Sequence, residues 1–175
     1  MSVRTVLAVV LAVVCCSISY PAIDDARSVR TNHHVDQELT RLENAMTDLV
    51  DESAVSIGDR GARRVVTLSV PSPSVTVADV EYVAIGGVPG TRRSKDVYGD
   101  VLAYRIEGGR RHVYHVPFDL RVAMRNGGNE NSDRWRLEPD RKPLVIRDIE
   151  HTTIELLLVK QHGERVILVI RSGEL

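Results

Sequence analysis

The chain has 175 residues, of which 43% are hydrophobic and 27% are charged, and its formal net charge is −1 at pH 7. This composition is typical of a folded globular protein and excludes an intrinsically disordered chain. The near balance of charge also argues against a nucleic-acid partner, because a nucleic-acid-binding surface needs a strong excess of Lys and Arg.

The N-terminal residues 1–23 form the clearest feature of the sequence. Every residue from Val6 to Cys16 is apolar, and no charge occurs between Arg4 and Asp24. A helix rises ~1.5 Å per residue, so this segment approaches the ~30 Å thickness of the hydrocarbon core of a bilayer. We therefore predict a transmembrane anchor at residues 1–23, with the lipid bilayer as its partner.

A cleaved secretory signal is the alternative for the same segment, because its apolar core has the length of a signal-peptide h-region. The small residues Ser17 and Ser19 suit a cleavage site, whereas the bulky Tyr20 does not. For an anchor, the positive-inside rule places Arg4 and the N-terminus in the cytoplasm. The sequence thus predicts a single-pass protein of the cell membrane whose remaining chain is extracellular.

The two cysteines, Cys15 and Cys16, both lie inside the apolar segment. Adjacent cysteines rarely bridge one another, so the rest of the chain must be stabilised by a hydrophobic core and not by disulfides. Acylation of one of them would make a lipid-anchored protein, although Val14 or Cys15 stands where a small residue is usual. Two small residues facing lipid or a neighbouring helix are the simpler interpretation.

Residues 24–52 are predicted to form an amphipathic helix that continues the anchor, with a bend near Pro21. Apolar residues recur at intervals of four and three, which places them on one helix face. We expect this stripe to pack on the following domain; a contact with another copy of the chain is the alternative. The stripe consists of Val35, Leu39, Leu42, Met46 and Leu49.

Residues 61–175 are predicted to form a β-rich domain. The expected strands span residues 63–70, 75–85, 101–107, 111–118, 120–125, 144–146, 154–160 and 165–171. In the hairpin around Gly108 and Gly109 we expect Tyr104 to face Tyr114. The last two strands meet around His162 and Gly163 and are apolar on both faces, so they should be central.

We further expect the helix stripe to cover these last two strands, through Leu39, Leu42 and Met46. The covered side chains would be Leu156, Leu158, Leu168 and Ile170. Trp135, the single Trp, shares a strand face with Leu137 and is predicted to close the core rather than to form an exposed binding site. The predicted fold class is α+β: an N-terminal transmembrane helix continues into an amphipathic helix packed on a mainly antiparallel β-sheet.

The sequence contains no residue set that specifies a reaction, so we predict no catalytic, cofactor-binding or metal-binding residue. His33 and His34 are consecutive on a helix and point about 100° apart, and His112 and His115 point to opposite faces of a strand. No serine lies in a Gly-x-Ser-x-Gly motif, and no cysteine lies outside the apolar segment. We therefore expect the protein not to be an enzyme.

The order of a hydrophobic helix, its amphipathic continuation and antiparallel strands resembles the plan of type IV pilin-like proteins. It is most similar to small single-anchor proteins of haloarchaea that are associated with pilus-type secretion systems. Only three of the basic residues are lysine, which is compatible with such a halophilic source. Pilins usually carry a Glu just inside the apolar segment, and this segment has none.

The resemblance implies a membrane-anchored, extracytoplasmic accessory or structural component of a pilus-type or secretion assembly. Its partners would be other pilus or secretion subunits. The alternative is a secreted or lipid-anchored module of the cell surface that binds a partner or ligand.

Overall fold

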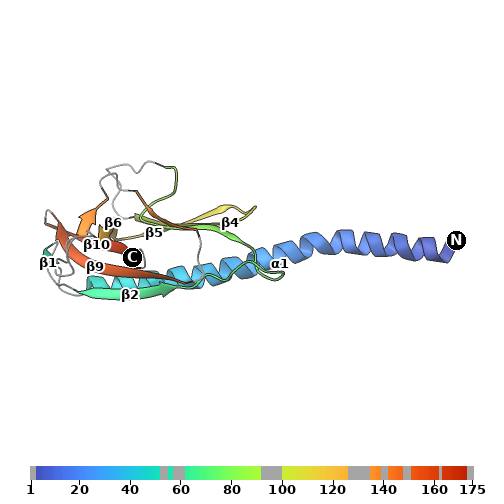
Figure 1. Cartoon of the computed structure of the whole chain (residues 1–175), viewed down its shortest axis with the longest axis horizontal. Coiled ribbons are helices and arrows are strands. Elements are labelled where there is room, and N and C mark those ends of the chain that lie inside the picture. Colours follow the sequence, from blue (N-terminus) through green and yellow to red (C-terminus); the bar gives the residue numbers. More distant parts are fainter. Residues whose placement is uncertain are drawn as a thin grey trace.

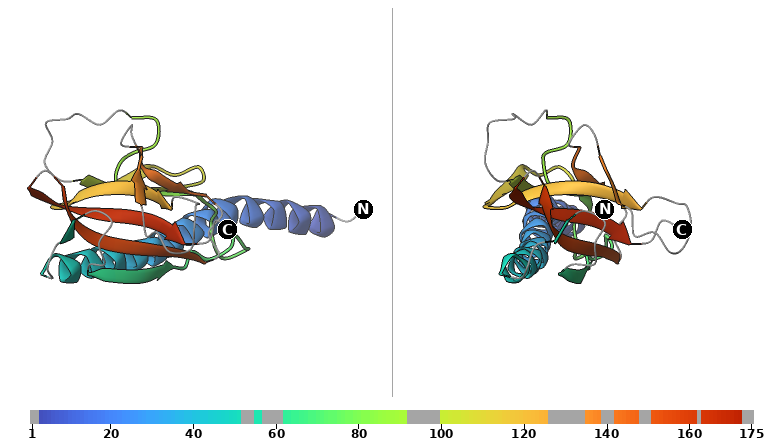
Figure 2. Two further views of the ribbon diagram at one scale, coloured as in Figure 1. Left: turned by 60° about the vertical axis from the view of Figure 1, so that its left-hand side comes forward. Right: turned by 90° about the vertical axis from the view of Figure 1, so that its left-hand side faces the viewer.

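The protein combines one long helix with two β-sheets (Figure 1). The computed structural model describes residues 3–51, 55–56, 62–91, 100–125, 135–138, 142–147, 151–161 and 163–172. The C-terminal half of the helix runs alongside the strands, whereas its N-terminal half projects beyond them (Figures 1 and 2). The fold is therefore α+β, as predicted.

Helix α1 (Val3–Val50) is continuous over 48 residues and contains Pro21. It contains no Gly, so backbone flexibility does not interrupt it. Arg165 donates a hydrogen bond from its guanidinium to the carbonyl of Val50 at 3.0 Å, which places a cation at the negative end of the helix dipole. The prediction that the apolar segment continues directly into the amphipathic helix is confirmed.

The first sheet has β9 (Thr152–Gln161) and β10 (Glu164–Ser172) at its centre. Two strands pair with the edge of β9 that faces away from β10. Strand β1 (Val55–Ser56) is parallel to β9, and β2 (Arg63–Leu68) is antiparallel to it. The sheet continues from β10 to the parallel strand β6 (Asp119–Arg125) and the short β7 (Trp135–Leu137).

The second sheet is antiparallel throughout, in the order β5-β4-β3-β8. Its strands are β3 (Val80–Ile85), β4 (Asp100–Ile106), β5 (Arg111–Val116) and β8 (Leu144–Ile146). The prediction of a single sheet is thus wrong. Strand propensity identifies strands one by one, whereas the division into sheets depends on pairings between distant segments.

The helix stripe is buried, and it shares one hydrophobic core with side chains of both sheets. The prediction that the stripe packs on the β-rich domain is confirmed for Val35, Leu39, Leu42, Met46 and Leu49. In the first sheet this core includes Ile154, Leu156 and Leu158 of β9 and Ile167 and Val169 of β10.

Leu168 and Ile170 were expected under the helix but lie on the other face of the first sheet, with Leu157 and Val159. The two-residue connection of β9 to β10 pairs Gln161 with Glu164. Even-numbered residues of β10 therefore lie opposite odd-numbered residues of β9 and share their face. This second cluster also receives Trp135 and Leu137, which are partly buried, so Trp135 closes a core as predicted.

The register of the β4–β5 hairpin also differs from the prediction. Tyr104 pairs with His112, and Leu102 pairs with Tyr114, a shift of two residues. The amide of Glu107 donates to the carbonyl of Asp79 at 2.9 Å, so Glu107 is held beside the start of β3 and not opposite Arg111. A shift of two keeps each side chain on its face, which is why the facial pattern could not reveal it.

The strand predicted over residues 75–85 begins only at Val80. Its first residues bond instead to α1: Arg27 donates to the carbonyl of Val77, and Thr31 accepts from the amide of Ala78.

We expect Leu42→Ala to lower the free energy of unfolding by about 2–5 kcal/mol, because it leaves a cavity in the core between α1 and the sheets. Thermal and denaturant melts of the full chain in lipid nanodiscs, followed by circular dichroism, measure this change. Leu7→Ala is the matched control, because Leu7 is exposed on the projecting half of α1. Equal effects of the two substitutions would contradict the assigned role of the stripe.

Candidate functional site

The projecting half of α1 is the largest exposed apolar surface among the described residues. It is the one described helix that is long and apolar enough to cross a membrane, and none of its most apolar window is buried in the protein. Its large exposed side chains are Val3, Val6, Leu7, Val9, Val10, Leu11, Val13, Val14, Ile18, Tyr20 and Ile23. Residues 3–23 are therefore a candidate membrane anchor.

Two polar side chains within this half, those of Ser17 and Ser19, are satisfied by the helix itself. Ser17 and Ser19 each donate a hydrogen bond of 2.8 Å to the backbone carbonyl four residues earlier. A hydroxyl that bonds within its own helix leaves no polar group to be solvated, so both serines are compatible with hydrocarbon. Cys15 and Cys16 are exposed free thiols, which agrees with their expected lack of a structural disulfide.

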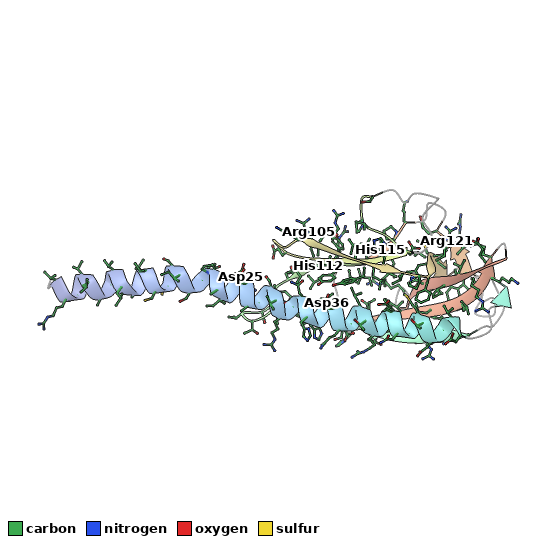
Figure 3. All side chains as sticks on the ribbon, turned by 180° about the vertical axis from the view of Figure 1, so that it is seen from behind. Asp25, Asp36, Arg105, His112, His115 and Arg121 are labelled. Carbon is green, nitrogen blue, oxygen red and sulfur yellow. The ribbon has the colours of Figure 1, made fainter. Side chains whose placement is uncertain are left out.

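A polar junction follows where α1 meets the β-domain. Arg27 lies 3.8 Å from Asp24, and its guanidinium donates to the carbonyl of Val77 at 3.0 Å. Asp25 is exposed at the point where the helix leaves the sheets (Figure 3). Charged side chains thus begin at Asp24, three residues before Arg27 contacts the β-domain.

Helix side chains bind both ends of the segment at residues 69–78, which connects β2 to β3. At one end, His34 donates from Nε2 to the carbonyl of Ser69 at 3.1 Å, and the buried Glu38 accepts from the Ser69 amide at 3.2 Å. At the other end, Thr31 accepts from the Ala78 amide at 3.0 Å. These bonds fix the position of the 69–78 segment along α1.

Two of the helix side chains in this junction are themselves held in place. The hydroxyl of Thr31 donates to the carbonyl of Arg27, and the carboxylate of Glu38 lies 3.0 Å from the guanidinium of Arg41. A buried carboxylate needs such a partner, because an unpaired buried charge is strongly destabilising. Thr31 and Glu38, which bind the 69–78 segment, are therefore each held by a further contact within α1.

A cleft of about 320 Å³ lies between α1 and the 69–78 segment. Its lining consists of Arg30, Thr31, His33, His34, Gln37, Pro71 and Val77. His34 bonds to Ser69, and the side-chain nitrogen of Gln37 lies 3.0 Å from Nε2 of His33. The lining contains no carboxylate or thiol and no hydroxyl other than that of Thr31, which is already both donor and acceptor. The arrangement therefore lacks the nucleophile-and-base pair of covalent catalysis.

A second polar cluster joins the opposite flank of α1 to β4 and β5. Asp36 Oδ1 accepts hydrogen bonds of 2.8 Å from the hydroxyls of both Tyr104 and Tyr114. The Tyr104 hydroxyl also lies 3.1 Å from Asn32 Oδ1. The ring of His112 stacks on that of Tyr104, with centroids 4.7 Å apart and planes inclined by 5°. Figure 3 labels both His112 and Asp36.

Both tyrosines of this cluster are held in the protonated form. Tyr104 is 0% exposed, and its burial raises the pKa of its hydroxyl, which the hydrogen bond to Asp36 and the Asp36 charge raise further. Tyr114 is 38% exposed, and the same causes raise its pKa as well. General acid–base catalysis is most efficient when the pKa lies near the working pH, so these phenols are suited to bracing α1 against the sheet and not to proton transfer.

The histidines do not converge in the structure. His112 stacks on Tyr104, whereas His115 is exposed on the same strand, and both are labelled in Figure 3. His33 and His34 line the cleft but contact different partners. Within the residues that the structure describes, no group of three or more His, Cys, Asp or Glu side chains is placed to hold a metal ion.

Sequence reasoning missed both polar clusters. Asp36 lies 68 residues before Tyr104 and 78 before Tyr114, and Glu38 lies 31 residues before Ser69. The available signal was that Asp36 and Glu38 flank the apolar stripe, one on each side.

A protein-family model described as a domain of unknown function (DUF7311) matches residues 2–172 of the chain, which therefore belongs to this family. The match includes the projecting half of α1 as well as the β-domain. Comparisons with curated proteins and with solved structures give no significant match.

We expect Tyr104→Phe to lower the free energy of unfolding by about 1–3 kcal/mol at pH 7, because a buried hydrogen bond to a charged group is lost. The substitution should also make the free energy of unfolding less dependent on pH under alkaline conditions. In the unfolded chain Tyr104 ionises near pH 10, whereas the raised pKa keeps it protonated in the folded protein. The stabilisation that the protonated Tyr104 hydroxyl gives the folded protein is complete below about pH 10 and is lost as the pH rises further.

Denaturant melts of the full chain between pH 7 and 11 test this expectation. Tyr20→Phe is the matched control, because Tyr20 is exposed on the projecting half of α1 and lies outside the Asp36 cluster. The expectation fails if Tyr104→Phe loses stability above pH 10 as steeply as the unmodified chain.

Proposed function

We propose that this member of the DUF7311 family is a single-pass membrane protein with no catalytic activity of its own. Helix α1 would anchor the β-domain at the extracellular face of the cell membrane. There the domain would serve as an accessory or structural component of a pilus-type or secretion assembly, with the other subunits of that assembly as partners.

One observation carries this proposal: a single helix has two halves suited to two different environments. Before Asp24 the large apolar side chains are exposed, and after Thr31 the apolar stripe is buried against the sheets. An exposed apolar surface of this extent is unfavourable in water but favourable in a bilayer. A continuous helix between the two regions would transmit force or position from the membrane to the domain.

Two further observations support the topology and the class of protein. Arg4 precedes the apolar segment, and the charges after it are the acidic Asp24 and Asp25, so the positive-inside rule favours a cytoplasmic N-terminus. The plan of a helix that projects from antiparallel sheets resembles that of type IV pilin-like proteins. The polar clusters on α1 support a scaffold role, because each joins the helix to a sheet or to the 69–78 segment.

Val10→Arg tests the anchor directly. A charge at this position costs about 2.5–3.5 kcal/mol of insertion free energy, so the variant should leave the carbonate-washed membrane fraction, and its β-domain should become inaccessible to protease added to whole cells. Val65→Arg is the matched control, because Val65 is exposed on β2, and it should behave like the unmodified chain. Unchanged fractionation and protease accessibility of Val10→Arg would contradict the anchor.

The assembly role has a separate test. Extracted in mild detergent, the full chain should migrate as a complex with other membrane proteins in fixed stoichiometry, and chemical cross-linking before extraction should preserve that complex. A chain that is monomeric in its detergent micelle, with and without cross-linking, would favour the alternative of an independent binding module.

A further inference from the structure

The 69–78 segment lies at the end of the β-domain that is nearest to the projecting half of α1. In Figures 1 and 2 it is the green loop that reaches farthest along the helix towards the N-terminus. Its contact with Arg27 is made only four residues after Ile23, the last residue of the apolar segment. The position of this loop relative to the membrane is therefore set by the helix.

The distance along the helix can be compared with the thickness of a bilayer. At ~1.5 Å per residue, Arg27 lies about 6 Å beyond Ile23. The polar headgroup region adds about 5–7 Å on each side of the hydrocarbon core. If residues 3–23 span that core, Arg27 and the Val77 carbonyl that it binds lie within the headgroup region.

Tilt of the helix does not change this conclusion. Transmembrane helices tilt by ~20° on average, which moves a point 10 Å from the axis by only about 3 Å along the membrane normal. Because Ser69 and Ala78 are both bonded to α1, the loop between them cannot swing away independently of the helix.

The chemistry of the loop suits an interface between water and lipid. No charged residue occurs from Val65 to Ala78, and residues 71–77 contain two prolines, two valines and three hydroxyl side chains. Val75 at the tip is 83% exposed, compared with 55% for Val65 and 40% for Val113. The backbone of the tip is internally paired, because Ser74 and Val77 exchange hydrogen bonds of 3.0 and 3.3 Å.

The charges nearest to this loop on α1 balance one another. Asp24 and Asp25 are matched by Arg27 and Arg30, so the helix offers no net charge at this level. The contact therefore relies on the apolar tip and the hydroxyl groups, and a zwitterionic lipid surface is sufficient for it.

We propose that residues 71–77 form a second membrane contact, in which Val75 enters the headgroup region of the bilayer and seats the β-domain upright on the lipid surface. This inference rests on the proposed function of α1 as a membrane anchor. The domain would then be held by two points, the spanning helix and the tip of this loop, and one defined side of it would face the lipid.

Spin labels in the full chain test this proposal. With Cys15→Ala and Cys16→Ala as background, single labels are placed at Val75→Cys, Val65→Cys, Val113→Cys and Val10→Cys. Each chain is reconstituted in nanodiscs of phosphatidylcholine, and collision rates with oxygen and with a water-soluble nickel chelate are measured. Val65 and Val113 are matched controls, because both are exposed valines of the β-domain.

We expect the label at Val75 to be severalfold less accessible to the nickel chelate, and more accessible to oxygen, than the labels at Val65 and Val113. The label at Val10 separates the two hypotheses. If Val10 is in lipid while Val75 is as aqueous as the controls, the loop contact is wrong and the anchor stands. If Val10 itself is aqueous, the anchor is wrong and the loop contact fails with it.

A second measurement avoids cysteine substitution altogether. Val75→Trp and Val113→Trp each add one indole to the common background of Trp135. Brominated phosphatidylcholine should quench the added fluorescence of Val75→Trp severalfold more than that of Val113→Trp. Equal quenching of the two variants would overturn the proposal.

Discussion

The packing of the helix stripe against two sheets is the interaction on which the rest of the fold depends. Strand β9 is apolar on both faces, so it needs cover on each side, and α1 supplies that cover on one of them. Five large buried side chains contribute roughly 10 kcal/mol at about 1.5–3 kcal/mol each. This is comparable to the whole net stability of a typical domain, about 5–15 kcal/mol, so the β-domain and the helix form one cooperative unit. The helix is therefore a structural element of the domain and not a tether attached to it.

The same helix must be compatible with two kinds of surroundings, and the change occurs within a few residues. The continuous run of exposed apolar side chains ends at Ile23, and charged residues begin at Asp24. Val29 is still exposed, and the first buried side chain is that of Thr31. Polar contacts between α1 and the 69–78 segment begin in this interval, at Arg27 and Thr31, and continue at His34 and Glu38. Because these contacts are directional, they set the position of the domain along the helix, which a smooth apolar stripe would leave free to slide.

The features that were predictable from the sequence are those that a periodic pattern of apolar residues within one segment indicates. The spacing of Val35, Leu39 and Leu42 identifies a helix face, and apolar residues on both faces of residues 154–160 and 165–171 identify central strands. Local periodicity does not reveal which distant segments pair. Strands β6 and β10 are parallel neighbours although about 40 residues separate them, and long-range pairings of this kind divide the strands into two sheets. The β4–β5 register was missed because a shift of two residues preserves every face. The Asp36 and Glu38 contacts were missed because their partners lie far away in sequence.

The arrangement of those two carboxylates around the stripe explains how the rotation of the helix is fixed. At about 100° per residue, Asp36 and Glu38 lie on opposite flanks of the face formed by Val35 and Leu39. Asp36 binds the hydroxyls of β4 and β5 in the second sheet, whereas Glu38 binds the amide that follows β2 of the first sheet. Hydrophobic packing is non-directional and tolerates some rotation about the helix axis, but two hydrogen-bonded carboxylates on opposite flanks do not. Since a continuous helix carries its rotation along its whole length, the flank that holds the 69–78 segment keeps one fixed relation to the projecting half of α1.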